Sequence, residues 1–110
     1  MKNSRLEDMT GGWLVGNFAP TVMQTDQFEV AIKTYKAGDK EAKHYHLQAD
    51  EITVIVSGTA IMFDKKWVAG DILVVEKGEA TAFEAVSDVT TVVIKSPSIP
   101  GDKFLSDAQG

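Results

Sequence analysis

The sequence contains no cysteine among its 110 residues. Disulfides, thiolate nucleophiles, iron–sulfur clusters and Cys-based zinc sites are therefore excluded. Any metal must be held by imidazole nitrogen and by oxygen, a donor set that suits iron, manganese, nickel, cobalt or zinc. Imidazole is itself scarce, because the chain has only two histidines, His44 and His46. Any nitrogen ligand to a metal must therefore come from that pair.

Long apolar runs and an excess of basic residues are also missing. No run approaches the length of a transmembrane helix, and the start, MKNSRLEDMTGGWLVGN, lacks the apolar core of a secretory signal. The net charge is -5, and the pI near 4.9 disfavours binding to nucleic acid or to an anionic membrane. The 44% hydrophobic and 25% charged shares are typical of a soluble globular protein. We expect a cytoplasmic protein that binds neither nucleic acid nor membranes.

Apolar residues alternate along much of the chain, which predicts strands. In residues 28–35 the even-numbered side chains share one face and the odd-numbered ones the other. Further strands are expected at 51–57, 59–63, 67–68, 71–75, 81–86 and 90–95, the first two forming a hairpin around Gly58. Many short strands separated by turns indicate an all-β sandwich or barrel. The length suits one domain over residues 1–110, with a core at 28–96, an N-terminal arm at 1–27 and a C-terminal tail at 97–110.

His44 and His46 are two residues apart, so in a strand both side chains point the same way. Glu51 begins the next apolar strand and shares a face with Thr53 and Ile55. If that face lines the interior, Glu51 enters the same cavity as the histidines. A buried carboxylate is costly unless a cation or hydrogen bonds offset the cost, so the three side chains are candidate metal ligands. A His-x-His pair alone is also common on surface strands, and that interpretation stays open on this evidence.

The spacing around the pair is more specific. Gly38 is followed after five residues by His44, then His46, and after four more by Glu51, with Gly58 six residues further on. This spacing resembles the first conserved motif of the cupin superfamily at every fixed position. The resemblance spans about residues 28–96. It implies a small antiparallel β-barrel of two jelly-roll-like sheets, with a divalent transition metal in the barrel mouth.

The second cupin motif is only partly present. Gly70 and Gly78 match its frame, but Glu76 stands where proline is usual. Thr81 replaces the histidine that would be the fourth metal ligand, and Ala85 replaces an asparagine. A site of three histidines and one glutamate is therefore out of reach. The two histidines and one carboxylate that remain resemble the facial triad of non-haem iron oxygenases. Three alternatives stay open: a metal held by three protein ligands and water, a metal bound only when metal is abundant, or a vestigial site in a protein that binds something else.

Cupin relatives include dioxygenases, sugar isomerases, epimerases and lyases. The resemblance therefore implies a metal-dependent enzyme acting on a small polar or sugar-like molecule. Tyr35, Thr81 and Phe83 are candidates to line the pocket, and Tyr35 or a glutamate at the rim could act as a general base. The alternative is a non-catalytic small-molecule or sugar-binding or accessory protein, because one barrel hosts many functions.

The segment SPSIPGDKFL (96–105) contains two prolines and a glycine, which favour an extended crossing followed by a turn. We interpret it as a closing segment of the fold or a contact with a second copy. Cupins of this size resemble one another in often forming homodimers by sharing edge strands, and we expect a homodimer here.

Overall fold

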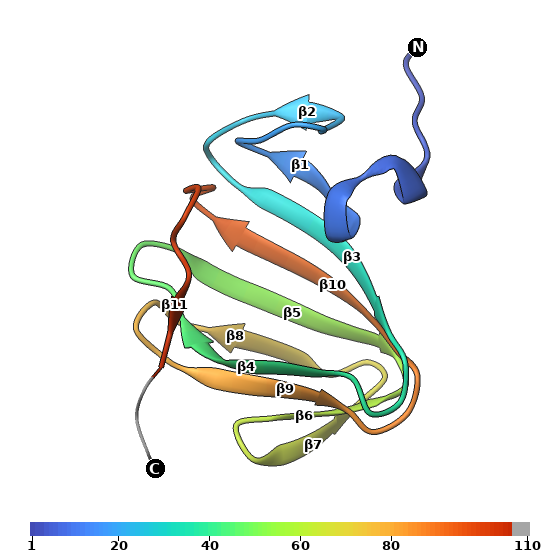
Figure 1. Cartoon of the computed structure of the whole chain (residues 1–110), viewed down its shortest axis with the longest axis vertical. Coiled ribbons are helices and arrows are strands. Elements are labelled where there is room, and N and C mark those ends of the chain that lie inside the picture. The colour runs from blue at the N-terminus through green and yellow to red at the C-terminus, as the bar shows by residue number, and fades with distance from the viewer. Residues whose placement is uncertain (107–110) are drawn as a thin grey trace.

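A computed structural model describes residues 1–106, so the end of the predicted tail, 107–110, lies outside the described residues. The described chain forms strands joined by tight turns, with two 3₁₀ helices near its start, η1 (Leu6–Asp8) and η2 (Thr10–Gly12). The strands, shown in Figure 1, are β1 (Trp13–Gly16), β2 (Met23–Gln24), β3 (Glu29–Tyr35), β4 (Lys40–Tyr45), β5 (Asp50–Ser57), β6 (Thr59–Met62), β7 (Lys65–Val68), β8 (Ile72–Val75), β9 (Thr81–Ala85), β10 (Val89–Ser96) and β11 (Phe104–Leu105). None of the helices in this part of the chain has the length and apolar character needed to span a bilayer.

The strands form two sheets that face each other. One has six strands in the order β2-β1-β3-β10-β5-β8, and the other has five in the order β11-β4-β9-β6-β7. Neighbouring strands are antiparallel except for β1 and β2. The predicted all-β, jelly-roll-like double sheet is confirmed.

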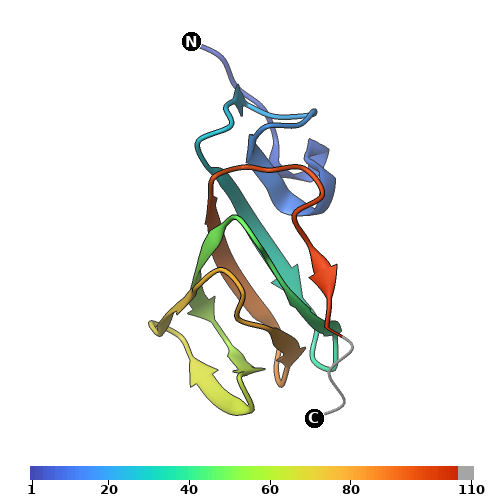
Figure 2. The ribbon, with the colours of Figure 1, turned by 90° about the vertical axis from the view of Figure 1, so that its left-hand side faces the viewer.

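Both ends of the chain add strands to the predicted core at 28–96. β1, in the N-terminal arm, pairs with β3, and β11, in the tail, pairs with β4. The tail leaves β10, passes from one sheet to the other and ends in β11 (Figure 2). Residues outside the predicted core therefore take part in both sheets.

The predicted alternation is confirmed in the two strands that matter most for the site. In β3, Ala31 is fully buried, and the other odd-numbered side chains of this strand line a cavity between the sheets. In β5, Thr53 is 2% exposed and Ile55 is fully buried, so the face that begins with Glu51 is the one that points inward.

The predicted hairpin at 51–63 is wrong. β5 and β6 lie in different sheets, and β5 pairs with β10 and β8 instead. Gly58 makes the crossing possible, because its φ of +87° is one that side chains disfavour, and a Cβ there would lie 2.0 Å from the Asp88 carbonyl oxygen. A glycine between two apolar strands signals a turn, but the sequence does not say whether the chain turns within a sheet or between sheets.

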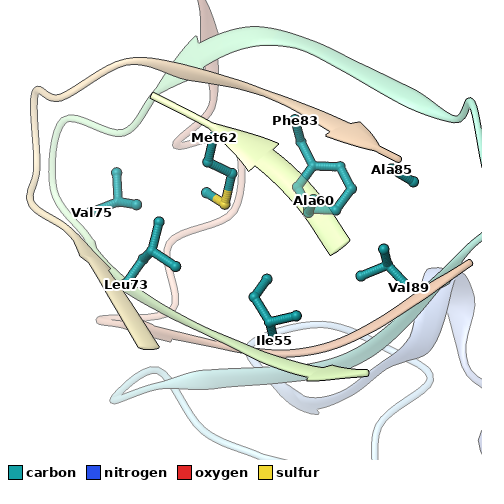
Figure 3. Packing of buried hydrophobic residues seen from close by; sticks show 8 residues of the cluster. All are labelled: Ile55, Ala60, Met62, Leu73, Val75, Phe83, Ala85 and Val89. Carbon is teal, nitrogen blue, oxygen red and sulfur yellow. The ribbon is translucent and has the colours of Figure 1, made fainter. Parts of the chain in front are cut away.

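The core occupies the space between the sheets and draws on both of them. Figure 3 shows side chains from β5 and β8 facing those from β6 and β9. The cluster consists of Ile55, Ala60, Met62, Leu73, Val75, Phe83, Ala85 and Val89. Burying one large apolar side chain stabilises the fold by about 1.5–3 kcal/mol, so this cluster holds the two sheets together. The cavity adjoins it, and Met62, Val75 and Phe83 belong to both.

Candidate functional site

A cavity of about 330 Å³ lies between the sheets, next to the core. His44, His46 and Glu51 all line it. Trp13 and Phe18 of the N-terminal arm form part of its wall, and Lys103 of the tail reaches it as well. Its volume and mixed polar and apolar lining suit a small molecule.

The two histidines sit at the end of β4. His44 is the last residue but one of the strand, and His46 follows directly after the strand ends at Tyr45. Their ring centroids are 5.3 Å apart. His46 is 3% exposed, whereas His44 is only half-buried. Both imidazoles therefore reach the same part of the cavity.

Backbone carbonyls fix the orientation of both rings. The Nδ1 atom of His44 lies 2.9 Å from the carbonyl oxygen of Ala42, and that of His46 is hydrogen-bonded to the carbonyl oxygen of Asp102. A carbonyl only accepts, so each Nδ1 must donate. In a neutral ring this leaves Nε2 with a free lone pair, the arrangement found in metal-binding histidines. Burial lowers the pKa of His44, which keeps that ring neutral near pH 7.

Glu51 lies next to His46. Its Oε1 is 3.4 Å from His46 Nε2, and its Oε2 accepts a hydrogen bond of 2.9 Å from the Thr53 hydroxyl. Burial acts to raise the pKa of Glu51, but the His46 ring and the Thr53 hydroxyl outweigh it, and the net shift is downward. Glu51 is therefore an ionised carboxylate facing the cavity.

His46 Nε2 is a buried atom without a hydrogen-bond partner in residues 1–106. Buried polar atoms nearly always have a partner. With Nδ1 protonated, the free lone pair of Nε2 faces an oxygen of the Glu51 carboxylate, so a cation must lie near both. Either a second proton on the ring or a metal ion meets that need. His44, His46 and Glu51 offer donors of a chemistry that suits a divalent metal. Within residues 1–106, however, no group of three or more His, Asp or Glu side chains is placed to hold a metal ion as it stands.

Thr81 occupies the position of the missing fourth ligand. It pairs with His44 across β4 and β9 and lines the cavity. Its hydroxyl accepts a hydrogen bond of 2.9 Å from the Phe63 N–H and donates one of 2.8 Å to the Ala82 carbonyl. The Thr81 side chain thus joins backbone groups of the five-stranded sheet. Its hydroxyl proton is donated to the Ala82 carbonyl and does not point to a ligand in the cavity.

Tyr35 and Phe83, the other predicted pocket residues, also line the cavity, with ring centroids 4.4 Å apart. The Tyr35 hydroxyl donates to Glu41 Oε2, which also lies 2.9 Å from Lys33 Nζ. Burial, followed by the charge of Glu41, raises the pKa of Tyr35 far above its usual value of 10.0. The phenol therefore keeps its proton at neutral pH. It can donate a hydrogen bond or a proton, but it does not act as the general base.

Asp102 is a functional residue that the sequence analysis missed. Its carboxylate accepts hydrogen bonds from three consecutive backbone N–H groups, at 2.9 Å from Leu47, 3.1 Å from Gln48 and 3.0 Å from Ala49. Its carbonyl oxygen holds the His46 ring. The segment 96–105, interpreted above as fold closure or a dimer contact, thus supports the site directly. An aspartate after a Pro-Gly turn often caps backbone N–H groups, but its partner 56 residues away cannot be inferred from the sequence.

Comparison with known proteins identifies the fold. No family model matches the sequence, and no curated protein is significantly similar to it. Solved structures are similar, among them a protein with a double-stranded β-helix domain from Klebsiella pneumoniae, at TM-score 0.70 and 20% identity over 76% of this chain and 74% of that one. This chain therefore has the double-stranded β-helix fold, which is the cupin fold.

Two enzymes share this fold with the chain. The DMSP lyase DddQ from Ruegeria pomeroyi matches at TM-score 0.72 and 18% identity, over 89% of this chain and 51% of that one. A sugar phosphate isomerase of the cupin superfamily from Silicibacter pomeroyi matches at TM-score 0.63 and 23% identity, over 74% and 58%. The chain thus spans only about half of each enzyme's length. At these identities the likeness concerns the fold, and the activities belong to those proteins.

Proposed function

We propose that this protein is a metal-binding cupin that holds a divalent transition metal through His44, His46 and Glu51 and takes a small polar molecule into the adjoining cavity. The observation that carries the proposal is the buried Nε2 atom of His46, which has no hydrogen-bond partner in the described chain and faces an ionised carboxylate. Nitrogen and oxygen donors suit iron, manganese, nickel, cobalt or zinc.

A bound metal would supply a Lewis acid that polarises an oxygen of the ligand. The protein's own residues have separate tasks. The Asp102 carbonyl keeps the His46 ring in the tautomer that leaves Nε2 free. Tyr35 presents a protonated phenol at the cavity wall, and the apolar side chains of the core exclude water from one side. Isomerase or lyase chemistry also needs a base, and Glu41, an ionised carboxylate that lines the cavity outside the proposed ligands, is placed to serve.

A non-catalytic binding protein is the second candidate. Thr81 favours it, because the hydroxyl in the position of the fourth ligand is committed to backbone hydrogen bonds. A three-ligand site also binds metal less tightly than a four-ligand site. Under this alternative the cavity still takes a small molecule, but no turnover follows and metal is not required.

Thermal unfolding after removal of metal by a chelator tests the proposal. Addition of Mn²⁺, Ni²⁺ or Zn²⁺ at a hundred times its Kd should stabilise the fold by about 2.7 kcal/mol, which raises Tm by roughly 10 °C in a domain of this size. His44→Ala should abolish the shift, because it removes one of the three proposed ligands. His44 is only half-buried, so the variant should still fold. Glu7→Gln changes an exposed carboxylate of the N-terminal arm outside the cavity. It is the control and should keep the shift in Tm. A shift that persists in His44→Ala would refute the assigned ligands.

We also propose that two copies associate through the outer face of the six-stranded sheet. Across β3, β10, β5 and β8, two adjacent rows of paired residues are apolar throughout: Ile32–Val92–Val54–Ile72 and Val30–Ile94–Ile52–Val74. Ile72 is 65% exposed and Val74 58%, on strand β8 at the edge of the sheet. The rows carry no charge, so two copies can meet face to face without burying like charges against each other.

A further inference from the structure

Three lysines line the cavity that contains the proposed metal ligands: Lys33, Lys95 and Lys103. An ammonium group beside a partly enclosed space is costly unless an anion offsets its desolvation. Lys33 has such a partner, because its Nζ lies 2.9 Å from Glu41 Oε2. Lys95 does not, since among residues 1–106 no carboxylate oxygen lies within 4.0 Å of its Nζ.

The surroundings of Lys95 hold its side chain toward the cavity. Lys95 lies on β10 between Glu29 of β3 and Glu51 of β5, in one row across the sheet. Its Nζ is 4.9 Å from the centre of the Trp13 ring, which belongs to the N-terminal arm. A cation over an indole face is attracted to it, so the ammonium rests against the arm and is half-buried. Burial lowers the pKa of Lys95, and the charges of Glu29 and Glu51 oppose but do not cancel that effect.

Lys103 approaches the same place from the tail. It follows Asp102, whose backbone and side chain are fixed by hydrogen bonds to residues 46–49. Lys103 and Lys95 both line this cavity, and both also line a second, smaller cavity beside the tail. Two ammonium groups from different segments thus meet at the cavity, next to the proposed metal ligands.

The charges that line the cavity balance only without a metal. Three lysines face three glutamates, Glu29, Glu41 and Glu51, so the side chains sum to zero. A divalent metal would leave two positive charges in excess. An anionic ligand would cancel some or all of this excess and would provide the partner that Lys95 lacks.

A second unpaired atom points to the polar character of such a ligand. Thr91 is 1% exposed and lines the cavity, yet its Oγ1 has no hydrogen-bond partner in the described chain. Thr91 is four residues from Lys95 on the same face of β10, which is about 13 Å along a strand. A small molecule with a charged group at Lys95 and a hydroxyl or carbonyl further in would span this distance.

We propose that the cavity binds a small organic anion, whose carboxylate or phosphate group contacts Lys95 and Lys103 and whose polar remainder reaches toward Thr91. The inference rests on the proposed function for the metal beside it, but the contacts to the anion come from the chain's own lysines. Lysine binds an anion as a point charge, so carboxylate and phosphate share this chemistry, and matched ligands must separate them.

Glucose, glucuronate and glucose 6-phosphate form a matched set, because they share a sugar ring and differ in charge. Acetate and inorganic phosphate have no sugar ring. They therefore test the contact with the lysines even if the cavity does not accept a sugar. With ionic strength held constant, we expect acetate or phosphate to raise Tm more than chloride does, and glucose to have no effect. The stronger of the two sugar anions identifies the preferred group.

Lys95→Met keeps the length of the side chain and removes its charge, and Lys103→Met does the same at an exposed position that tolerates change. Each should weaken binding of the stabilising anion by at least about tenfold, the contribution of one charge-assisted hydrogen bond. Lys66→Met, at an exposed lysine of β7 outside the cavity, should bind it as the natural sequence does.

The inference is overturned if neither acetate nor phosphate stabilises the protein more than chloride, or if Lys95→Met and Lys103→Met respond as the natural sequence does. The same titrations with and without chelator keep the two proposals apart. If the protein binds no metal when metal is added back, but the anion still stabilises it, the metal site is refuted and this inference stands. Metal binding without any anion effect would do the reverse.

Discussion

At the scale of single residues, Asp102 shows how much of the site depends on a side chain outside the proposed ligands. Its carboxylate accepts hydrogen bonds from the N–H groups of residues 47–49, and its carbonyl oxygen accepts one from the His46 ring. The loop after β4 and the tail are thereby joined. Displacement of Asp102 would therefore also displace the His46 ring, whose Nε2 atom faces Glu51.

Asp102→Asn should lower the free energy of unfolding by about 2–3 kcal/mol at pH 7, because hydrogen bonds to a charged group contribute about 1.5–3 kcal/mol and an amide accepts them less well. Burial acts to raise the pKa of Asp102, but the N–H groups of Leu47, Gln48 and Ala49 lower it further, so the folded-state pKa lies below the ordinary value of 3.8. The stabilisation is therefore complete above about pH 4 and is lost as the pH falls through the folded-state pKa.

Urea unfolding between pH 7 and pH 2 measures both effects. The natural sequence should lose stability below about pH 4, and Asp102→Asn should start lower and decline less over that range. Asp8→Asn, at an exposed aspartate in η1, is the control and should follow the natural sequence. Parallel curves for Asp102→Asn and the natural sequence would show that the carboxylate charge does not contribute.

The sequence predicted some of these residues and not others, for a physical reason. His44, His46 and Glu51 are close in the chain, so strand alternation and motif spacing were enough to propose them. Lys95 reaches the same site from β10 and Asp102 reaches it from the tail, and their roles depend on how the sheets pair. Pairing over such separations leaves no local pattern in one sequence.

At the scale of elements, alternation predicts where strands lie and which of their side chains share a face, but it does not predict strand partners. The hairpin prediction failed at Gly58, where the chain leaves one sheet for the other. The crossing needs a positive φ and close contact with the backbone at Asp88. Both requirements come from the sheet-to-sheet geometry rather than from the residues on either side of the turn.

Gly58→Ala and Gly70→Ala separate these two requirements. Both glycines have positive φ, +87° and +95°, but only Gly58 has a neighbouring atom where the methyl group would go, at 2.0 Å. Gly70→Ala should cost about 1–2 kcal/mol from backbone conformation alone. Gly58→Ala should cost about 1–3 kcal/mol more, because the Asp88 backbone must move. Equal losses in urea unfolding would mean that the contact at the crossing is not a constraint.

At the scale of the whole molecule, the two faces of the six-stranded sheet have different tasks. The inner face builds the core and the cavity, and the outer face presents two uninterrupted apolar rows that end on the edge strand β8. Such a continuous apolar surface is unusual on a monomer. Alternation predicted which side chains of a strand share a face, whereas the choice of which face points inward came from the tertiary structure.

Ile72→Lys places a charge in this surface and should shift the protein from dimer to monomer in size-exclusion chromatography with light scattering. Val68→Lys is the matched control, since Val68 is 52% exposed but belongs to β7 of the other sheet. It should leave the molar mass unchanged. A natural sequence that is monomeric at high concentration, or a dimer unaffected by Ile72→Lys, would rule out this face as the contact.

The most direct test of the central claim is the metal content of the protein after removal of metal, reconstitution with manganese, iron, nickel, cobalt or zinc, and equilibrium dialysis. The natural sequence should retain one ion of the preferred metal per chain. His44→Ala and Glu51→Gln should retain almost none while remaining folded by circular dichroism. A natural sequence that retains no metal under any of these conditions, or variants that retain as much as it does, would contradict a metal site at His44, His46 and Glu51.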